Sequence, residues 1–388
     1  MRRLGFHDRF GCLCVGALIG GLLLLTNSAQ GEAATTLTAA QTEVMRSALH
    51  QTLALQFEEA LATATNLEEN EEPTLVSQLT RGIIAYFQAR WQTRQYPAAR
   101  QSGHRALTTL LEKGPPKLKR SPEDRWLLLI LGTAAVIDAI LQQDHAPLES
   151  LPRFSQGQIW LQQALVQHED TADAHLGLGL LYFADTALAG PIARLLRPSA
   201  EGTGGTMAIH HLQRASEKGQ FSQEVARTFL LRVYEQEHRY EEAIKLGLEL
   251  QSTFPENGYY ALRTGSAQCA LSRYADCAAT LGALVSRHTR IPGSLGHRSD
   301  RFDLFYQWGV ALTELGLHDS AFRAYRKAIN QDPSITHDET LWAKFQVARH
   351  YERRQQNKTA RQFYQTLLRG RNIDDLHQRI TRRLRSLP

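Results

Sequence analysis

The sequence lacks any alternating strand pattern, and it carries only a small excess of charge of one sign. A formal net charge of +5 over 388 residues is too small by itself to indicate a nucleic-acid-binding protein. Hydrophobic residues make up 43% and charged residues 21%, an ordinary globular composition that argues against bulk disorder. The length suits two ordinary domains or one long repeat array.

Sequence signatures of catalysis and metal binding are also missing. There is no glycine-rich loop between a strand and a helix, no nucleophile elbow and no His-x-x-x-His helix. The glycine-rich stretch 202–205 has no strand before it, so a linker explains it better than an anion site. We therefore expect no enzyme activity, no cofactor and no metal, and we interpret His210 and His211 as a surface pair.

The first 33 residues have the order of a secretory signal. Basic residues precede an uncharged apolar run from Cys12 to Leu25, and small residues follow at 28–34. The run is shorter than the roughly 20 residues of a bilayer span, so cleavage between Ala29 and Ala34 is favoured over a retained anchor. Cys12 and Cys14 open the run, which argues against a lipoprotein. We expect an exported protein, periplasmic or in the cell envelope if the source is Gram-negative.

A spacing of small and large residues recurs in the C-terminal part. Counted from Gly309, residues follow at offsets of 3, 12, 16, 19 and 24, namely Leu312, Ala321, Tyr325, Ala328 and Pro333. The same spacing fits from Leu231, from Gly265 and from Ala348, and Leu231 to Gly265 spans 34 residues. A second apolar stretch, 126–141, contains an aspartate, so we interpret it as a buried helix.

This spacing resembles the tetratricopeptide repeat, strongly over 222–369 and more weakly over 40–220. The resemblance implies antiparallel helix pairs whose small residues let two backbones approach, and such pairs stack because none can bury its apolar face alone. We expect an all-α, right-handed α-solenoid of about eight pairs, with a basic capping helix in 370–388. An insertion at 185–206 is either a contact element for a partner or membrane, or a loop folded back over the array.

Partners of tetratricopeptide arrays usually lie along the concave surface of the first helices, so the resemblance implies a groove that binds proteins or peptides. The expected groove residues are Thr228, Arg232, Tyr259, Leu262, Tyr306, Trp342, Phe345 and Arg349. The family's chaperone-binding members clamp a peptide carboxylate with Lys and Asn, which are missing at these positions. Aromatic residues with two arginines suit a peptide with apolar anchors and some acid. For Trp342 and Phe345, packing against the next repeat or the cap is the alternative.

Two cysteines lie beyond the signal. Cys277 takes the small position of a second helix, and Cys269 lies one turn beyond Gly265, so both should face the seam inside one hairpin. A disulfide and a pair of buried free thiols both remain open at this stage.

Charge is unevenly distributed along the chain. Residues 32–80 carry eight glutamates and one arginine, whereas 340–388 carry twelve basic and three acidic residues. The basic end would attract an acidic partner or an anionic membrane surface, or it is simply a solvated cap.

The sequence thus favours an exported, non-catalytic scaffold for protein–protein interaction, without nucleic acid. The alternative is a membrane-associated assembly or tethering factor that uses the insertion and the basic helix.

Overall fold

The structure is a computed structural model, and it describes residues 37–69, 74–92, 96–143, 145–168, 171–187, 204–290, 295–296, 298–331 and 338–388. Several helices begin at an N-cap residue: the side chains of Thr38, Thr74 and Asp124 each accept a hydrogen bond from the backbone of the first turn. The described chain holds seventeen helices and no strand. They are α1 (Ala39–Leu53), α2 (Phe57–Thr65), α3 (Leu75–Trp91), α4 (Tyr96–Arg120), α5 (Arg125–Gln142), α6 (Pro147–Gln167), α7 (Ala174–Ala187), α9 (Gly204–Lys218), α10 (Gln223–Gln236), α11 (Tyr240–Thr253), α12 (Gly258–Ala270), α13 (Tyr274–Arg290), α14 (Arg298–Glu314), α15 (His318–Gln331), α16 (Asp338–Arg353), α17 (Asn357–Leu368) and α18 (Leu376–Ser386).

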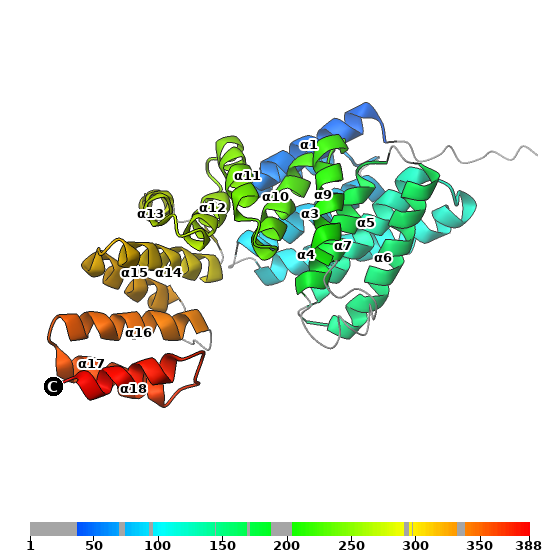
Figure 1. Cartoon of the computed structure of the whole chain (residues 1–388). Helices are drawn as coiled ribbons and strands as arrows, with labels where there is room; N and C mark the ends of the chain where they lie inside the picture. The colour runs from blue at the N-terminus through cyan, green and yellow to red at the C-terminus, as the bar shows by residue number, and fades with distance from the viewer. Residues whose placement is uncertain are drawn as a thin grey trace, which may run out of the picture. The chain divides into compact units, whose positions relative to one another are not determined.

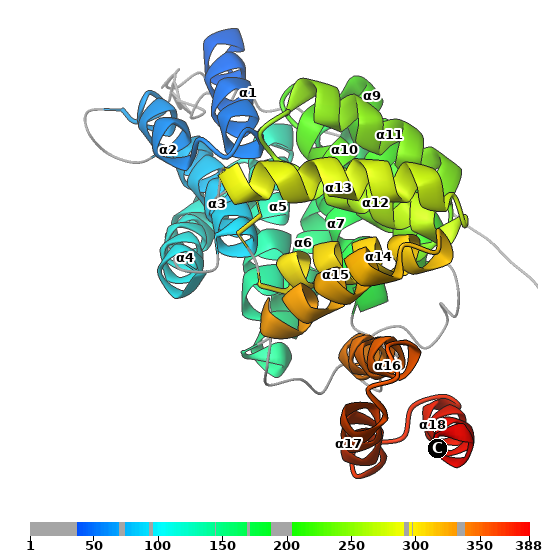
Figure 2. The ribbon, with the colours of Figure 1, turned by 90° about the vertical axis from the view of Figure 1, so that its left-hand side faces the viewer.

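Helices adjacent in the chain pack as pairs, and the pairs stack into an all-α solenoid (Figure 1). The pairs are α1–α2, α3–α4, α5–α6, α7–α9, α10–α11, α12–α13, α14–α15 and α16–α17, and α18 packs against α17. The eight pairs and the final helix agree with the expected number and with the expected fold class. Figure 2 shows α14 and α15 between the α12–α13 pair and α16–α18.

Small residues sit where the recurring spacing places them. A Cβ atom on Gly265 of α12 would lie 2.3 Å from Leu281 Cδ2 of α13, and one on Gly309 of α14 would lie 2.8 Å from the Tyr325 ring of α15. Each position is therefore a close approach between the two helices of one pair, and only glycine fits there without a shift.

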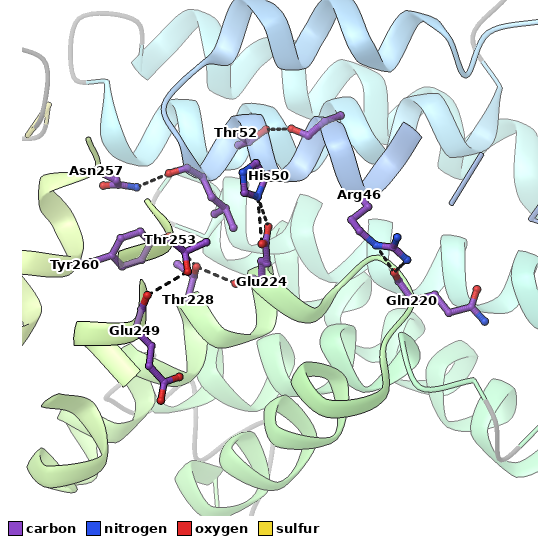
Figure 3. Close-up of polar contacts among 12 residues, drawn as sticks. Arg46, His50, Thr52, Gln220, Glu224, Thr228, Glu249, Thr253, Asn257 and Tyr260 are labelled. Atoms are coloured by element: carbon purple, nitrogen blue, oxygen red, sulfur yellow. Dashed lines mark hydrogen bonds and ion pairs between the residues drawn. The ribbon is translucent and has the colours of Figure 1, made fainter. Parts of the chain in front are cut away.

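The first five pairs make a closed circuit of contacts. Their first helices touch in the order α1, α3, α5, α7 and α10, and α10 packs back against α1. Figure 3 shows this closure: Arg46 Nη2 donates to Gln220 O at 2.6 Å, and His50 Nδ1 lies 3.0 Å from Glu224 Oε2. Asn257 Nδ2, just before α12, donates to Leu53 O at 2.8 Å. Consequently these first helices face one another instead of lining an open groove.

One apolar core fills the inside of this circuit. It runs from Leu37 to Ala267 without a break at 220–222, where the regular spacing begins, and residues 35–388 form one unit. Helix α5 is long and apolar enough to cross a membrane, yet 83% of it is buried inside the protein. The interpretation of 126–141 as a buried helix is therefore confirmed. From α12 onward the apolar residues form three smaller clusters.

Two expected segments fall largely outside the described residues. The secretory signal at 1–33 lies outside them, and so does most of the insertion at 185–206. The two ends of that insertion are helical, because α7 runs to Ala187 and α9 begins at Gly204. The handedness of the solenoid stays a prediction.

The surface-pair interpretation is wrong for His211, whose residue is only 8% exposed. His211 stacks on Tyr182, and its Nδ1 lies 2.7 Å from His175 Nδ1 of α7. Burial and the neighbouring histidines lower the pKa of His211 to about 4. Burial, His210 and Arg214 lower the pKa of His175 to about 4 as well. Both rings are therefore neutral near pH 7 and can share one proton between their Nδ1 atoms.

Candidate functional site

A cavity of about 410 Å³ opens where the closed circuit meets the following pairs. Its walls come from the carboxyl-terminal turns of α3, α5 and α7, the middle of α10 and the first turns of α12 and α14. These are all first helices of their pairs. The lining residues are Tyr86, Phe87, Ala89, Arg90, Trp91, Ile140, Leu141, Gln143, Phe183, Ala184, Thr228, Phe229, Arg232, Tyr259 and Ser299.

Six of the lining residues are aromatic, and they pack on one another across the four helices α3, α7, α10 and α12. The Trp91 ring of α3 lies 5.6 Å from the Tyr259 ring of α12, and the Phe229 ring of α10 lies 5.5 Å from Tyr86 and 5.8 Å from Phe183. Contacts between tilted rings hold the wall rigid, because each ring is fixed by neighbours from another helix.

Two arginines bring hydrogen-bond donors to this aromatic wall. Arg232 donates to Glu235 Oε2 at 3.0 Å, and its side chain is 29% exposed. Arg90 Nη2 lies 3.7 Å from Asp300 Oδ1, which is an ion pair but too long for a hydrogen bond. A guanidinium carries five N–H donors, so each arginine keeps donors for a ligand in the cavity.

The charges behind the wall form a compact network. Arg263 of α12 lies within 4.0 Å of carboxylate oxygens of Glu235, Asp300 and Asp303, and its guanidinium lies over the Tyr259 ring. With Arg90 and Arg232, three cations match three carboxylates, so the network is neutral overall. Burial raises the pKa of Tyr259 against the pull of the arginines, which keeps the phenol protonated.

Three of the eight expected groove residues meet at this cavity: Thr228, Arg232 and Tyr259. Thr228 is 3% exposed, and its Oγ1 is hydrogen-bonded to Tyr260 Oη at 2.9 Å, so most of this side chain serves packing. Tyr259 is also buried and presents one side to the cavity.

Leu262 and Phe345 do not lie in a groove, and this part of the prediction is wrong. Leu262 is fully buried in the cluster between α12, α13 and α14. Phe345 is 4% exposed and packs against Tyr364 of α17. Both residues lie three positions before a small residue, and both are taken up by packing instead of facing an open surface.

The remaining three expected residues lie away from the cavity. Tyr306 stacks on Phe302 and approaches Tyr325, so it packs within the α14–α15 pair. Arg379 of α18 covers the Trp342 ring at 5.3 Å, which is the packing against the cap weighed for that residue. Arg349 donates to Gln346 on its own helix. Cys269 and Cys277 form a disulfide that joins α12 to α13.

Sequence reasoning missed the lining residues of α3, α5 and α7. The recurring spacing is weak in this region, and it fixes which residues face the partner helix within a pair. It does not fix how far one pair slides along the next, and that offset brings the carboxyl ends of α3, α5 and α7 level with the start of α12. The aromatic run Tyr86, Phe87 and Trp91 was the available signal.

No family model and no curated protein matches the chain. Among solved structures it is similar to YrrB, a TPR protein with an unusual peptide-binding site, with 16% identity and a TM-score of 0.43 over 60% of this chain and 98% of that one. It is also similar to the apo form of RapI, with 11% identity and a TM-score of 0.44 over 90% and 97% of the two chains. Yeast Tom70 shows 12% identity and a TM-score of 0.39 over 89% and 83%. All three sequence identities lie under 25%, and all three TM-scores lie under 0.5.

Proposed function

We propose that this chain is an exported, non-catalytic scaffold that binds another protein by taking an apolar side chain of a partner segment into the cavity. The cavity carries this proposal, because its volume of about 410 Å³ falls in the range of binding pockets and its wall combines aromatic rings with arginines. Aromatic residues and arginine are the side chains that contribute most to protein interfaces.

The arginines define what accompanies the apolar side chain. Arg90 and Arg232 offer N–H donors beside the rings, so the bound segment presents hydrogen-bond acceptors, either backbone carbonyls or a carboxylate. The neutral network behind them leaves little net positive charge to attract an anion alone. The apolar contact therefore supplies affinity, and the arginines orient the segment.

The composition of the wall suits binding better than catalysis. Its described residues include guanidinium, phenol, hydroxyl and amide groups but no histidine, cysteine or carboxylate. Histidine is the most frequent general acid–base catalyst, and carboxylates are common ones. A scaffold function accounts for the lining without a reaction.

The tethering alternative is not favoured by the geometry of α18. Its apolar residues Leu376 and Ile380 are buried against α17, so they are not available to a membrane. Two of its arginines are paired, Arg379 with Asp375 and Arg383 with Glu352.

Peptide selection tests the proposal directly. A displayed peptide library should yield sequences with an aromatic or large aliphatic residue beside an acceptor-rich segment, and fluorescence anisotropy then measures their affinity. We expect Arg232→Ala to weaken binding about tenfold or more, since a lost hydrogen bond to a charged group costs ~1.5–3 kcal/mol.

Arg227→Ala is the matched control. Arg227 lies on the same helix, is 30% exposed against 29% for Arg232, and also makes one ion pair, with Glu249. It does not line the cavity. Equal loss of affinity in both variants, or none in either, would contradict binding in the cavity. If free amino acids bind as tightly as the selected peptides, the cavity is a small-molecule site instead.

Export is the second part of the proposal, and it rests on the basic, apolar and small order of residues 1–33. Mass spectrometry of the native protein should find an N-terminus between Ala29 and Ala34. A retained Met1 would contradict cleavage.

A further inference from the structure

Three arginines from α16 and α18 come together at the basic end of the chain. Arg349 and Arg353 are one helical turn apart on α16, so their side chains leave the same face of that helix. Arg383 of α18 joins them, because its Nη1 lies 3.2 Å from Oε1 of Glu352, the residue before Arg353. We call Arg349, Arg353 and Arg383 the cation cluster.

The cation cluster holds more positive charge than its neighbours neutralise. Among the described residues, no carboxylate oxygen lies within ion-pair distance of Arg349 or Arg353, and Arg349 donates to the neutral amide of Gln346 at 3.3 Å. Both oxygens of Glu352 are engaged, one by the cluster itself and the other by the Tyr364 hydroxyl, which donates to it at 2.7 Å. Three cations therefore face one carboxylate.

Arg349 is the least exposed member of the cluster. It is partly buried, whereas Arg353 and Arg383 are exposed. Burial and the guanidiniums of these two arginines lower the pKa of Arg349, because each disfavours its charged form. The group still carries its charge near pH 7, as arginine does throughout proteins. The folded protein thus holds a partly buried cation without a counter-ion, which is unfavourable until an anion binds.

We propose that the cation cluster binds a partner segment that carries two carboxylates. One turn of α16 separates Arg349 from Arg353 by ~6 Å along the helix axis. Alternate residues of an extended peptide lie ~6.6 Å apart on the same side, so Asp or Glu at every second position can meet both guanidiniums. Two carboxylates also supply the negative charge that the cluster lacks, and each can accept two N–H groups from one arginine.

The surroundings of the cluster suit a peptide better than a membrane. A carboxylate on a flexible side chain can reach the partly buried Arg349, whereas a flat lipid surface meets the exposed arginines first. Leu376 and Ile380 of α18 are buried, so this helix has no apolar face to insert into a bilayer. The cluster shares no residue with the cavity, so this site adds to the function proposed for the cavity.

Fluorescence anisotropy of the full chain with the labelled peptide Gly-Ser-Glu-Ser-Glu-Ser-Gly tests the proposal. The parent should bind this peptide and not its glutamine analogue. We expect Arg349→Gln to weaken binding about tenfold or more, as for a lost hydrogen bond between charged groups. Arg382→Gln is the matched control, because Arg382 is an exposed arginine of α18 outside the cluster and its loss changes the net charge equally.

Three binding results would overturn the proposal. They are no binding of the glutamate peptide by the parent, equal weakening by Arg349→Gln and Arg382→Gln, and tighter binding of the parent to phosphatidylserine vesicles than to the peptide. Arg232→Ala should bind the glutamate peptide like the parent. A loss in that variant would place the peptide in the cavity and would also overturn the separate site.

Thermal unfolding without peptide distinguishes a binding role of Arg349 from a structural one. Arg349→Gln removes a cation that has no counter-ion, so this variant should melt at the temperature of the parent or above it. Adding the glutamate peptide should raise the melting temperature of the parent and leave that of the variant unchanged. A variant that melts below the parent would show that Arg349 serves the fold, contrary to the proposal.

Discussion

Single glycines decide how closely the helices of a pair approach. A Cβ atom on Gly265 would lie 2.3 Å from Leu281, whereas one on Gly282 of α13 would first meet Trp308 at 3.3 Å. We expect Gly265→Ala to destabilise the protein by ~1–3 kcal/mol through overpacking. Gly282→Ala should be near neutral, because improved helix propensity offsets the tighter contact. Thermal unfolding of both variants checks this, and equal melting would show that α12 and α13 can shift apart.

The Cys269–Cys277 disulfide closes a short loop around the turn between α12 and α13. Cross-linking a loop of this size stabilises by ~2–3 kcal/mol in the chain-entropy description. We expect a reducing agent to lower the melting temperature of the parent and to leave Cys277→Ala unchanged. Cys277→Leu should melt lower than Cys277→Ala, because position 277 is fully buried. A parent insensitive to reductant would show that the disulfide does not form.

The His175–His211 pair makes stability depend on pH. The pKa of each is lowered to about 4 in the folded protein, below the ordinary ~6.5 of the unfolded chain. The unfolded chain therefore binds more protons between these values, so stability is complete above pH 6.5 and falls as the pH drops toward 4. His211 is buried and His175 is partly buried, so the loss is on the order of a few kcal/mol.

His211→Phe should flatten this dependence, because phenylalanine can keep the stacking on Tyr182 and carries no titrating group. Denaturant unfolding at pH 8, 6 and 4.5 measures it. The values at pH 8, where the histidines are neutral in both states, report any packing change separately. A variant as sensitive to acid as the parent would place the acid-labile groups elsewhere.

At the scale of helices, the pairs could be predicted from sequence but their closure could not. The spacing from Gly309 to Tyr325 lies within one pair, so local sequence carries it. Arg46 donates to the backbone carbonyl of Gln220. Every residue has such a carbonyl, so the identity of residue 220 could not have predicted this contact. The same limit applies to the cavity: Arg232 was found from the repeat spacing, whereas Arg90 and Phe183 required knowledge of how pairs slide on one another.

Asn257 links two elements that lie far apart in the chain. Its Oδ1 caps α12 by accepting from Tyr259 N at 3.2 Å, and its Nδ2 donates to Leu53 O. Asn257→Ser should keep the cap and lose the link, so hydrogen exchange should quicken in α1 and α2 while α12 stays protected. Asn257→Ala should lose both and cost ~1 kcal/mol more. Unchanged exchange in α1 with the serine variant would show that the link is dispensable.

Across the whole molecule, burial is uneven. One core unites the helices from α1 to α12, whereas α16–α18 depend on a small cluster of their own and on a second one that α16 shares with α14 and α15. The free energy of local unfolding is lower for terminal repeats with few neighbours than for helices that share a large core. We expect amide exchange to be fastest in α16–α18 and slowest in α5, as measured by mass spectrometry of peptic fragments. Uniform protection would mean that the whole array unfolds as one unit.

The closure of α1 onto α10 and α12 also sets an order of events during synthesis. The hydrogen bond from Asn257 joins residues 204 positions apart. Repeat arrays normally gain structure one neighbour at a time as the chain emerges, since their contacts are local. Here the surface of α1 that contacts α10 and Asn257 can be covered only after the chain has been synthesised as far as α12. The N-terminal helices are thus the first to be synthesised and among the last to be completed.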